Sequence, residues 1–458
     1  MADGLDTTAA AAPRAVANHA TFTGTDTPAR VAGAGRDDMS YAEAVAWLVQ
    51  QRRGGRPRDP EVAAALLRSL RVPPPPLALH VVGTNGKGTV AHLLAAMAQA
   101  AGLRAGRFTS PHVEDLRERV AVNGELVAPE EVVAFVAAAR ARQATGIGFF
   151  EWTLALAADV FHRAGVELAV IEAGVGARRD ATLAWPNVAG TILTNVELDH
   201  VETLGPTLLD IARDKAAVAR PGVPLVTGAR GEALEVVLEV ANEVGSPVWA
   251  VHPDHPLAAW PAGGPAIGAS WPPTRVEDAG LALALGRVLG WPEAVLASGL
   301  ASPPPPARFE RFQLVVDDRG VEVVLDGAHD PSATARLAAA LPAGFVLLFG
   351  SLARKRRLDA LAPLRARAAE VWLTSAEPGE EPPPPPAADG PPVRSEACLE
   401  DALAGAAAAA AARGAPLVVA GSLHLAGHAR PWLRRRDVGR GGAGAMLAGR
   451  WDASASSA

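Results

Sequence analysis

The chain has 458 residues, more than one hydrophobic core usually organises, so two domains are expected. Hydrophobic residues make up 49% of the sequence, but charged residues, Gly and Pro interrupt them too often for a membrane-spanning helix. The formal net charge of −6 excludes the basic surface that nucleic-acid binding requires. A single cysteine and no secretory signal pattern at the N-terminus fit a cytoplasmic protein with neither membrane nor nucleic-acid partners.

Lysine is rare in this sequence. Of the 43 basic residues only three are lysines, at positions 87, 215 and 355. Nucleotide-composition bias explains why arginine replaces lysine, but not why three lysines remain. A buried ammonium can lose its proton, whereas a guanidinium cannot. Lys87, Lys215 and Lys355 are therefore candidates for roles that arginine cannot fill.

The sequence pattern in the first part of the chain predicts a parallel α/β sheet. Residues 1–38 lack apolar periodicity and predict a disordered tail. From Tyr41 onward, strand-like runs alternate with helical periodicity, which is typical of βαβ units. We assign residues 39–298 to this domain. Its expected elements are helices at 41–50, 60–70, 130–142 and 152–164, and strands at 77–82, 166–174 and 189–196.

The second part predicts a smaller, Rossmann-like α/β domain at residues 299–440, followed by a disordered tail at 441–458. Residues 252–274 hold too much Pro and Gly for regular elements, and a helix is expected next. The proline-rich residues 301–312 read as a linker. The remaining expected elements are a helix at 278–290, strands within 321–328, 344–351, 369–376 and 416–422, and a solvated loop at 377–392.

The stretch HVVGTNGKGTV, residues 80–90, places a glycine-rich turn between a strand and a helix. Gly83 and Gly86 let backbone N–H groups turn toward a phosphate at the helix N-terminus. Lys87 would reach the β and γ phosphates, and the Thr89 hydroxyl would ligate magnesium. The common GxxxxGK[ST] spacing is not met, because Val81 stands where the first Gly belongs and Gly88 separates Lys87 from Thr89. The alternative is a structural turn without nucleotide.

Three polar residues are expected at one edge of the first sheet. Thr89, Glu172 and His200 each lie at or just beyond the carboxyl end of a predicted strand, where parallel sheets bind ligands. Together with phosphate oxygens they suit magnesium. The alternatives are a Glu172 paired with Arg178 or Arg179, and an ordinary buried His200.

The turn GTNGKG[ST] resembles that of the Mur ligase family, and specifically of folylpolyglutamate synthase/dihydrofolate synthase. Matching stretches such as "TSPHVEDLRERVAVNG", "IEAGVGARRDAT" and "LDGAHDPSA" recur in the family's order. The matching blocks lie at residues 83–89, 107–127, 149–161, 170–182, 197–218, 307–312, 325–333, 347–351 and 418–427.

The resemblance implies a P-loop ATP-binding domain, a glutamate ligase domain, and an enzyme that uses ATP and Mg²⁺ to add L-glutamate to a folate or dihydropteroate carboxylate through an acyl phosphate. It implies a monomer whose Lys215 is carbamylated. The implied catalytic residues are Lys87, Glu172, His200 and Lys215, and Thr89, Glu172 and His200 would bind the metal. The implied ATP site is Gly83, Thr84, Asn85, Gly86, Lys87, Gly88, Thr89, Arg308, Asp326 and His329. The implied substrate residues are Thr109, Ser110, Pro111, His112, Arg178 and Asp180, with Arg117, Arg119 and Arg179 as further clamps for anionic substrates.

Several positions depart from the family pattern. Leu183 and Asp330 replace asparagines, Ala177 replaces a glycine, and the residues around Lys355 also differ. These departures concern the acceptor more than the phosphates. Two alternatives therefore stay open: a Mur-type ligase that adds an amino acid to another carboxylate, which the wording LTNVELDH favours, and a non-catalytic ATP-binding protein.

Overall fold

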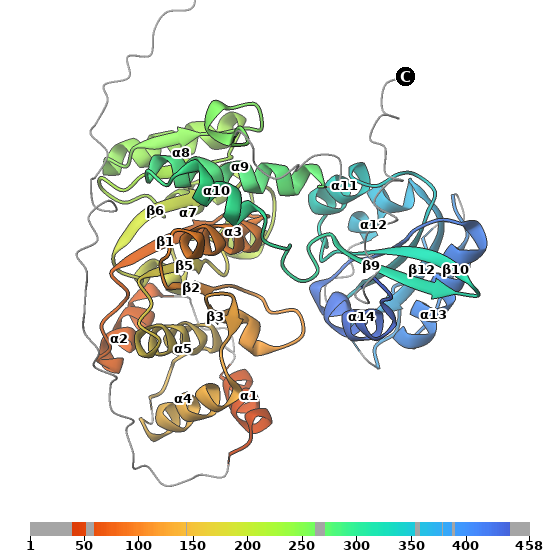
Figure 1. Ribbon diagram of the computed structural model, residues 1–458, viewed down its shortest axis with the longest axis horizontal. Helices are drawn as coiled ribbons and strands as arrows, with labels where there is room; N and C mark the ends of the chain where they lie inside the picture. The colour runs from red at the N-terminus through yellow and green to blue at the C-terminus, as the bar shows by residue number, and fades with distance from the viewer. Residues whose placement is uncertain are drawn as a thin grey trace, which may run out of the picture.

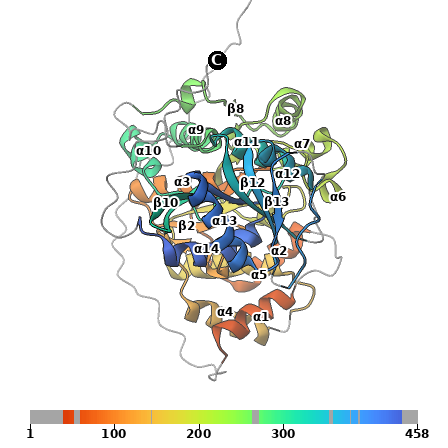
Figure 2. The ribbon, with the colours of Figure 1, turned by 90° about the vertical axis from the view of Figure 1, so that its right-hand side faces the viewer.

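The computed structural model describes residues 39–51, 59–142, 144–261, 271–352, 358–377, 379–386 and 390–439. The chain forms two lobes that lie side by side, the first coloured red to green and the second cyan to blue (Figure 1). Turned by 90°, the second lobe lies in front of the first (Figure 2). The predicted tails at 1–38 and 441–458, and Lys355, lie outside the described residues.

The first lobe is built on an eight-stranded sheet with the order β4-β3-β2-β5-β1-β6-β7-β8. The strands from β2 to β8 in this order run parallel, whereas β3 is antiparallel to both β2 and β4. The strands are β1 (Leu77–Val82), β2 (Ala105–Phe108), β3 (Val120–Val122), β4 (Glu125–Leu126), β5 (Leu168–Glu172), β6 (Val188–Leu193), β7 (Leu225–Thr227) and β8 (Val248–Ala250).

Helices cover both faces of this sheet, because its central strands are apolar on both sides. In β1, Leu79 and Val81 face one helix layer, while Ala78 and Val82 face the other. The first layer contains α3 (Lys87–Ala100), α9 (Pro273–Val288) and α10 (Glu293–Leu300). The second layer contains α1 (Tyr41–Gln50), α2 (Pro60–Leu70), α4 (Pro129–Ala141), α5 (Phe149–Arg163), α7 (Leu208–Ala216) and α8 (Gly231–Val244). The short helix α6 (Val201–Leu204) precedes α7.

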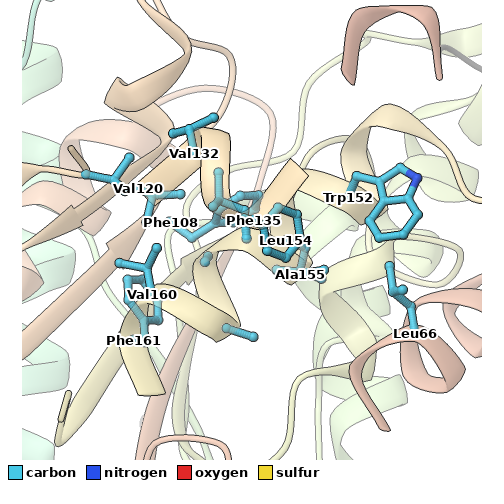
Figure 3. Close-up of a cluster of buried hydrophobic side chains, with 14 of the residues drawn as sticks. Leu66, Phe108, Val120, Val132, Phe135, Trp152, Leu154, Ala155, Val160 and Phe161 are labelled. Atoms are coloured by element: carbon cyan, nitrogen blue, oxygen red, sulfur yellow. The ribbon is translucent and has the colours of Figure 1, made fainter. Parts of the chain in front are cut away.

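Aromatic and aliphatic side chains fill the core around α5, which packs against both the sheet and α4, as Figure 3 shows. Trp152, Phe108 and Phe161 are fully buried, and the Trp152 and Phe135 rings meet edge to face with centroids 6.2 Å apart. Burying one such side chain contributes roughly 1.5–3 kcal/mol. This core fixes the sheet whose carboxyl edge carries the site.

The second lobe is built on a six-stranded sheet with the order β13-β12-β11-β14-β10-β9, parallel except for β9. Alternate residues of β11 and β14 face opposite helix layers, α13 and α14 on one side and α11 and α12 on the other. The elements are β9 (Glu310–Val316), β10 (Arg319–Leu325), α11 (Pro331–Ala339), β11 (Phe345–Ser351), α12 (Leu358–Arg365), β12 (Ala368–Ser375), β13 (Val393–Ser395), α13 (Leu399–Arg413), β14 (Leu417–Ala420) and α14 (Leu423–Arg436).

The predicted α/β fold with two parallel-rich sheets is confirmed, and α1, α2 and β1 have the predicted bounds. Two expectations were wrong in part. β9 begins at Glu310 inside the predicted linker, and a 3-10 turn at Pro256–Ala258 and the start of α9 fall within the segment expected to lack regular elements. The short strands β2, β3, β4, β7, β8 and β13 were not predicted. In the part of the chain that the structure describes, no helix is long and apolar enough to cross a membrane.

The loop between β2 and β3 connects the two lobes. Val113 in this loop packs against the core of the second lobe. Its carbonyl oxygen lies so close to Gly427 of α14 that a Cβ at position 427 would overlap it. Arg430 of the same helix donates hydrogen bonds to Glu310 of β9 at 2.7 and 2.8 Å and also pairs with Glu114 of the loop.

Candidate functional site

The carboxyl edges of both sheets border one cavity of about 610 Å³. From the first lobe it receives the glycine-rich turn after β1, Glu172 at the end of β5, and Asp199 and His200 after β6. From the second lobe it receives Arg308, His329 and residues 421–424 after β14. A cavity between two sheets, lined by the loops that follow their strands, is the usual position for ligands in α/β proteins.

Only glycine fits at two positions of the turn. Gly83 and Gly86 have φ values of 145° and 83°, and a Cβ would overlap Thr194 at the first and Asp278 at the second. The segment after β6 holds the turn from the side. Asn195 accepts the Thr84 N–H at its carbonyl oxygen (3.1 Å) and the Asn85 N–H at its side-chain oxygen (2.9 Å). The turn is therefore preformed at the N-terminus of α3.

Lys87 lies over this turn. Its Nζ donates to the carbonyl oxygens of Gly83 at 3.1 Å and Thr84 at 2.9 Å. Burial lowers the pKa of the Lys87 ammonium, and attraction to Glu172 opposes that shift only in part. A buried cation held by carbonyl oxygens alone is poorly neutralised, so an anion in the cavity would be attracted to it.

Glu172 is the last residue of β5 and is buried beside the first turn of α3. Its Oε2 accepts the Ser110 N–H at 2.9 Å. Burial raises the pKa of the Glu172 carboxyl despite the attraction of Lys87 and two arginines. One of these, Arg107, was not predicted. A buried carboxylate with incomplete charge compensation suits an added cation.

The three predicted metal ligands divide between two adjoining cavities. Glu172 and His200 line the large cavity, whereas Thr89 lines a neighbouring one of about 100 Å³ together with Asp278. His200 is 38% exposed and its Nε2 lies 3.4 Å from Asp199 Oδ2. Among the described residues no three His, Cys, Asp or Glu side chains group into a complete metal site. Phosphate oxygens or water would have to supply the remaining ligands.

Lys215, on α7, is buried directly behind the turn. Its Nζ donates to the Gly83 carbonyl oxygen at 2.7 Å. Burial, together with repulsion from Lys87, lowers the pKa of Lys215 to about 7. A substantial fraction of this amine is therefore neutral near pH 7, unlike an exposed lysine.

The second lobe contributes Arg308, Asp326 and His329. Arg308 stands between Ala307 and Phe309, which have φ values of 53° and 52°, a strained conformation for residues other than glycine. Asp326 holds this backbone, since its Oδ2 accepts the Phe309 N–H and its Oδ1 the Ala328 N–H, both at 2.8 Å. All three predicted residues border the smaller cavity, and Arg308 and His329 also border the larger one.

The predicted substrate residues are only partly brought to the cavity. Ser110, Pro111 and Asp180 line it, as do the clamps Arg119 and Arg179. The others face elsewhere: the Thr109 hydroxyl donates to the Glu118 carbonyl oxygen, His112 Nδ1 accepts from Arg119, Arg117 pairs with Asp115, and Arg178 is not among the lining residues.

Other cavity residues were missed at the sequence level. Phe149 and Phe150 form an apolar wall, and Arg119 lies over the Phe149 ring at 5.0 Å. Asp199 precedes the predicted His200, and Ser351, Ser422 and His424 come from the second lobe. These residues lie within the blocks that resemble the family, so their motif positions could have indicated them.

The departures from the family pattern have local structural roles. Asp330 caps α11, because its Oδ1 accepts the Ala333 N–H at 2.9 Å, a role asparagine fills equally well. The Leu183 carbonyl oxygen accepts from Arg220 at 2.8 Å, and the Ala177 N–H donates to Asp214 at 2.8 Å. None of the three residues lines the large cavity.

Comparison with known proteins agrees with this arrangement. Residues 81–224 match the Mur ligase middle domain, and residues 310–423 match the Mur ligase glutamate ligase domain. The two lobes are thus those of a Mur ligase.

Within the Mur ligases, the chain is most usefully compared with folylpolyglutamate synthases. The folylpolyglutamate synthase of Lacticaseibacillus casei is 31% identical over 432 residues, covering 86% of this chain and 99% of that protein. The chain therefore belongs to the folylpolyglutamate synthase/dihydrofolate synthase family.

Two further relatives extend the comparison. A probable bifunctional folylpolyglutamate synthase/dihydropteroate synthase of Haloferax volcanii is 34% identical over 439 residues, covering 86% of this chain. The chain spans 51% of that protein's length. The Yersinia pestis folylpolyglutamate synthase/dihydrofolate synthase structure with AMPPNP and a Mn ion has a TM-score of 0.72 and 25% identity, covering 86% of this chain and 98% of its own.

Proposed function

We propose that the protein is an ATP-dependent ligase that joins L-glutamate to the carboxyl group of a folate or dihydropteroate. A carboxylate oxygen of the acceptor attacks the γ-phosphorus of ATP, the bond from that phosphorus to the bridging oxygen breaks, and ADP leaves. The glutamate amino group then attacks the acyl carbon, loses a proton, and releases inorganic phosphate as the amide forms.

The observation that carries this proposal is the cavity shared by both lobes. Lys87 and the preformed turn would hold the β and γ phosphates, and Arg308 would neutralise charge from the opposite side. Arg119, Arg179 and the Phe149 wall would receive an acceptor with an aromatic body and an anionic end. Water must be kept away from the acyl phosphate, which closure of the two lobes over the cavity would achieve.

Magnesium and a modified lysine belong to the same proposal. The raised pKa of buried Glu172 fits a neighbouring cation, so Glu172, His200 and Thr89 are the residues that would hold Mg²⁺. The ion would neutralise phosphate charge. The lowered pKa of Lys215 supports carbamylation, because only a neutral amine reacts with carbon dioxide.

Amide formation by the purified protein tests the proposal. ATP, Mg²⁺ and L-glutamate are supplied with dihydropteroate, with tetrahydrofolate, or with a UDP-muramoyl acceptor, and both phosphate release and the amide product are measured. We expect product with at least one of the two pteridine acceptors. Product with the UDP-muramoyl acceptor alone would favour the other Mur-type reaction. ATP binding without turnover on any acceptor would mean a non-catalytic nucleotide-binding protein.

The domain limits, oligomeric state and location remain part of this proposal. We infer separate domains at residues 39–298 and 299–440, supported by the separate hydrophobic clusters of the two lobes, and limited proteolysis would test that boundary. We also propose a cytoplasmic monomer, which light scattering and cell fractionation would test.

A further inference from the structure

An ion pair joins the two lobes beside the glycine-rich turn. Glu197 lies in the loop after β6, and Arg336 lies on α11 of the second lobe. Both terminal nitrogens of Arg336 donate to the two oxygens of Glu197, with Nη2 lying 3.2 Å from Oε2. The side chains are only 26% and 22% exposed, so water screens the pair less than it would a surface pair.

Glu197 is tied to the phosphate-binding turn at several atoms. Its Oε2 accepts from the Asn85 side-chain amide at 2.9 Å, and its backbone N–H donates to the Thr84 hydroxyl at 3.1 Å. The Thr84 hydroxyl lies 3.4 Å from the Glu197 carbonyl oxygen, to which it donates. The carboxylate that holds Arg336 is therefore positioned by the turn itself.

Arg336 is tied in the same way to the second lobe's part of the site. Its helix, α11, begins directly after the loop that carries Asp326 and His329. Burial alone would lower the pKa of Arg336, but hydrogen bonding and attraction to Glu197 outweigh it and raise the pKa. Asp330 and Glu277 add weaker attraction, so Glu197 is the principal partner of this guanidinium.

We propose that Glu197 and Arg336 are positioning residues that lock the second lobe over the phosphate-binding turn. The inference rests on the proposed ligase reaction, because the closed cavity is needed to keep water from the acyl phosphate. Loss of the pair leaves the turn and Lys87 in place but lets the lobes separate at this end. ATP is then still consumed, while more of the acyl phosphate is lost to hydrolysis.

The variants that test this are Glu197→Gln, Arg336→Gln, and the double variant that combines the two changes. Glu197→Gln keeps an oxygen that can accept from Asn85, so the turn is retained. The matched control is Arg213→Gln, which breaks an exposed pair with Glu239 (3.2 Å) inside the first lobe. Each single variant is expected to raise the ADP released per amide formed by roughly fivefold, the scale of one partly buried ion pair. The control should leave that ratio unchanged.

A structural readout does not depend on the reaction. Cys398 is exposed on the second lobe and is the only cysteine of the chain, so Glu130→Cys on α4 allows a dye pair to report the distance between lobes. We expect lower energy transfer in both single variants and no further decrease in the double variant, because either change alone already breaks the pair. Unchanged transfer and an unchanged ADP-to-amide ratio in the single variants would overturn the inference. Failure of the unmodified enzyme to form amide would instead count against the proposed function, and the energy-transfer result would still decide whether the pair holds the lobes together.

Discussion

The two lobes share an architecture but present different chemistry at the edges that face the cavity. The first lobe carries buried groups whose pKa values are moved toward neutrality, Lys87, Glu172 and Lys215. The second lobe carries Asp326, whose pKa burial also raises but whose two oxygens already accept backbone N–H groups, and Arg308, which a strained backbone presents. Buried charged groups that lack full charge compensation are poised to act on a ligand, whereas groups already held by hydrogen bonds serve to position the ligand. The first lobe is therefore expected to govern the chemical step, and the second lobe substrate position.

The largest effect is expected from Lys87→Met in the first lobe. It removes the ammonium that would face the transferred phosphate, so kcat should fall by about 10³-fold, as when a preorganised charge is lost. Steady-state amide formation measures this, and circular dichroism checks that the fold persists. Retention of more than a tenth of the activity would contradict the assignment of chemistry to this lobe.

The next largest effect is expected from Lys215→Arg, which keeps the positive charge but cannot be carbamylated. If the modified lysine organises the site, activity should fall by about 10²-fold, the scale of lost support around a metal or phosphate centre. The unmodified enzyme should lose activity reversibly in buffer free of carbon dioxide, and mass spectrometry should detect the added carboxylate. Full activity of Lys215→Arg would rule out a carbamate.

A smaller effect, of a different kind, is expected from Arg308→Gln in the second lobe. The change removes a charge that positions the nucleotide, so KM for ATP should rise by about tenfold, as for the loss of a charged hydrogen bond, with kcat changing less. Arg311→Gln, in the neighbouring strand β9, is the matched control. A fall in kcat as large as that of Lys87→Met would erase the proposed difference between the lobes.

The smallest expected effect concerns stability rather than activity. Burial lowers the pKa of Lys215 from 10.5 to about 7, so between these pH values the unfolded chain binds a proton that the folded chain does not. The free energy of unfolding should therefore rise with pH across this window, and Lys215→Met should lose that rise. Urea titrations of both proteins in buffer free of carbon dioxide measure it; equal pH dependence would show that Lys215 does not titrate as inferred.

Local patterns made part of this molecule predictable. The strand, turn and helix around Lys87 are encoded within residues 77–100, and apolar runs identified the central parallel strands. The two- to four-residue strands β2, β3, β4, β7, β8 and β13 were not predicted, because they carry little periodicity of their own and depend on pairing with neighbouring strands.

The same limit applies to the candidate site. Lys87, Glu172 and Arg308 could be found from motifs, since each lies in a recognisable stretch. Asp278 beside Thr89, and Arg336 paired with Glu197, join residues more than a hundred positions apart. Such contacts depend on how α9 and α11 are placed in three dimensions, and local sequence patterns do not reveal that placement.

The contact between Gly427 and the Val113 carbonyl oxygen bears on how this protein can be engineered. The loop between β2 and β3 packs against a helix more than three hundred residues further along the chain, so the surfaces of loop and helix must match. A chimera that exchanges the second lobe between two relatives must also carry residues 109–119 from the same donor. If α14 alone is exchanged, any side chain larger than hydrogen at position 427 would overlap the Val113 carbonyl oxygen and displace the loop from α14.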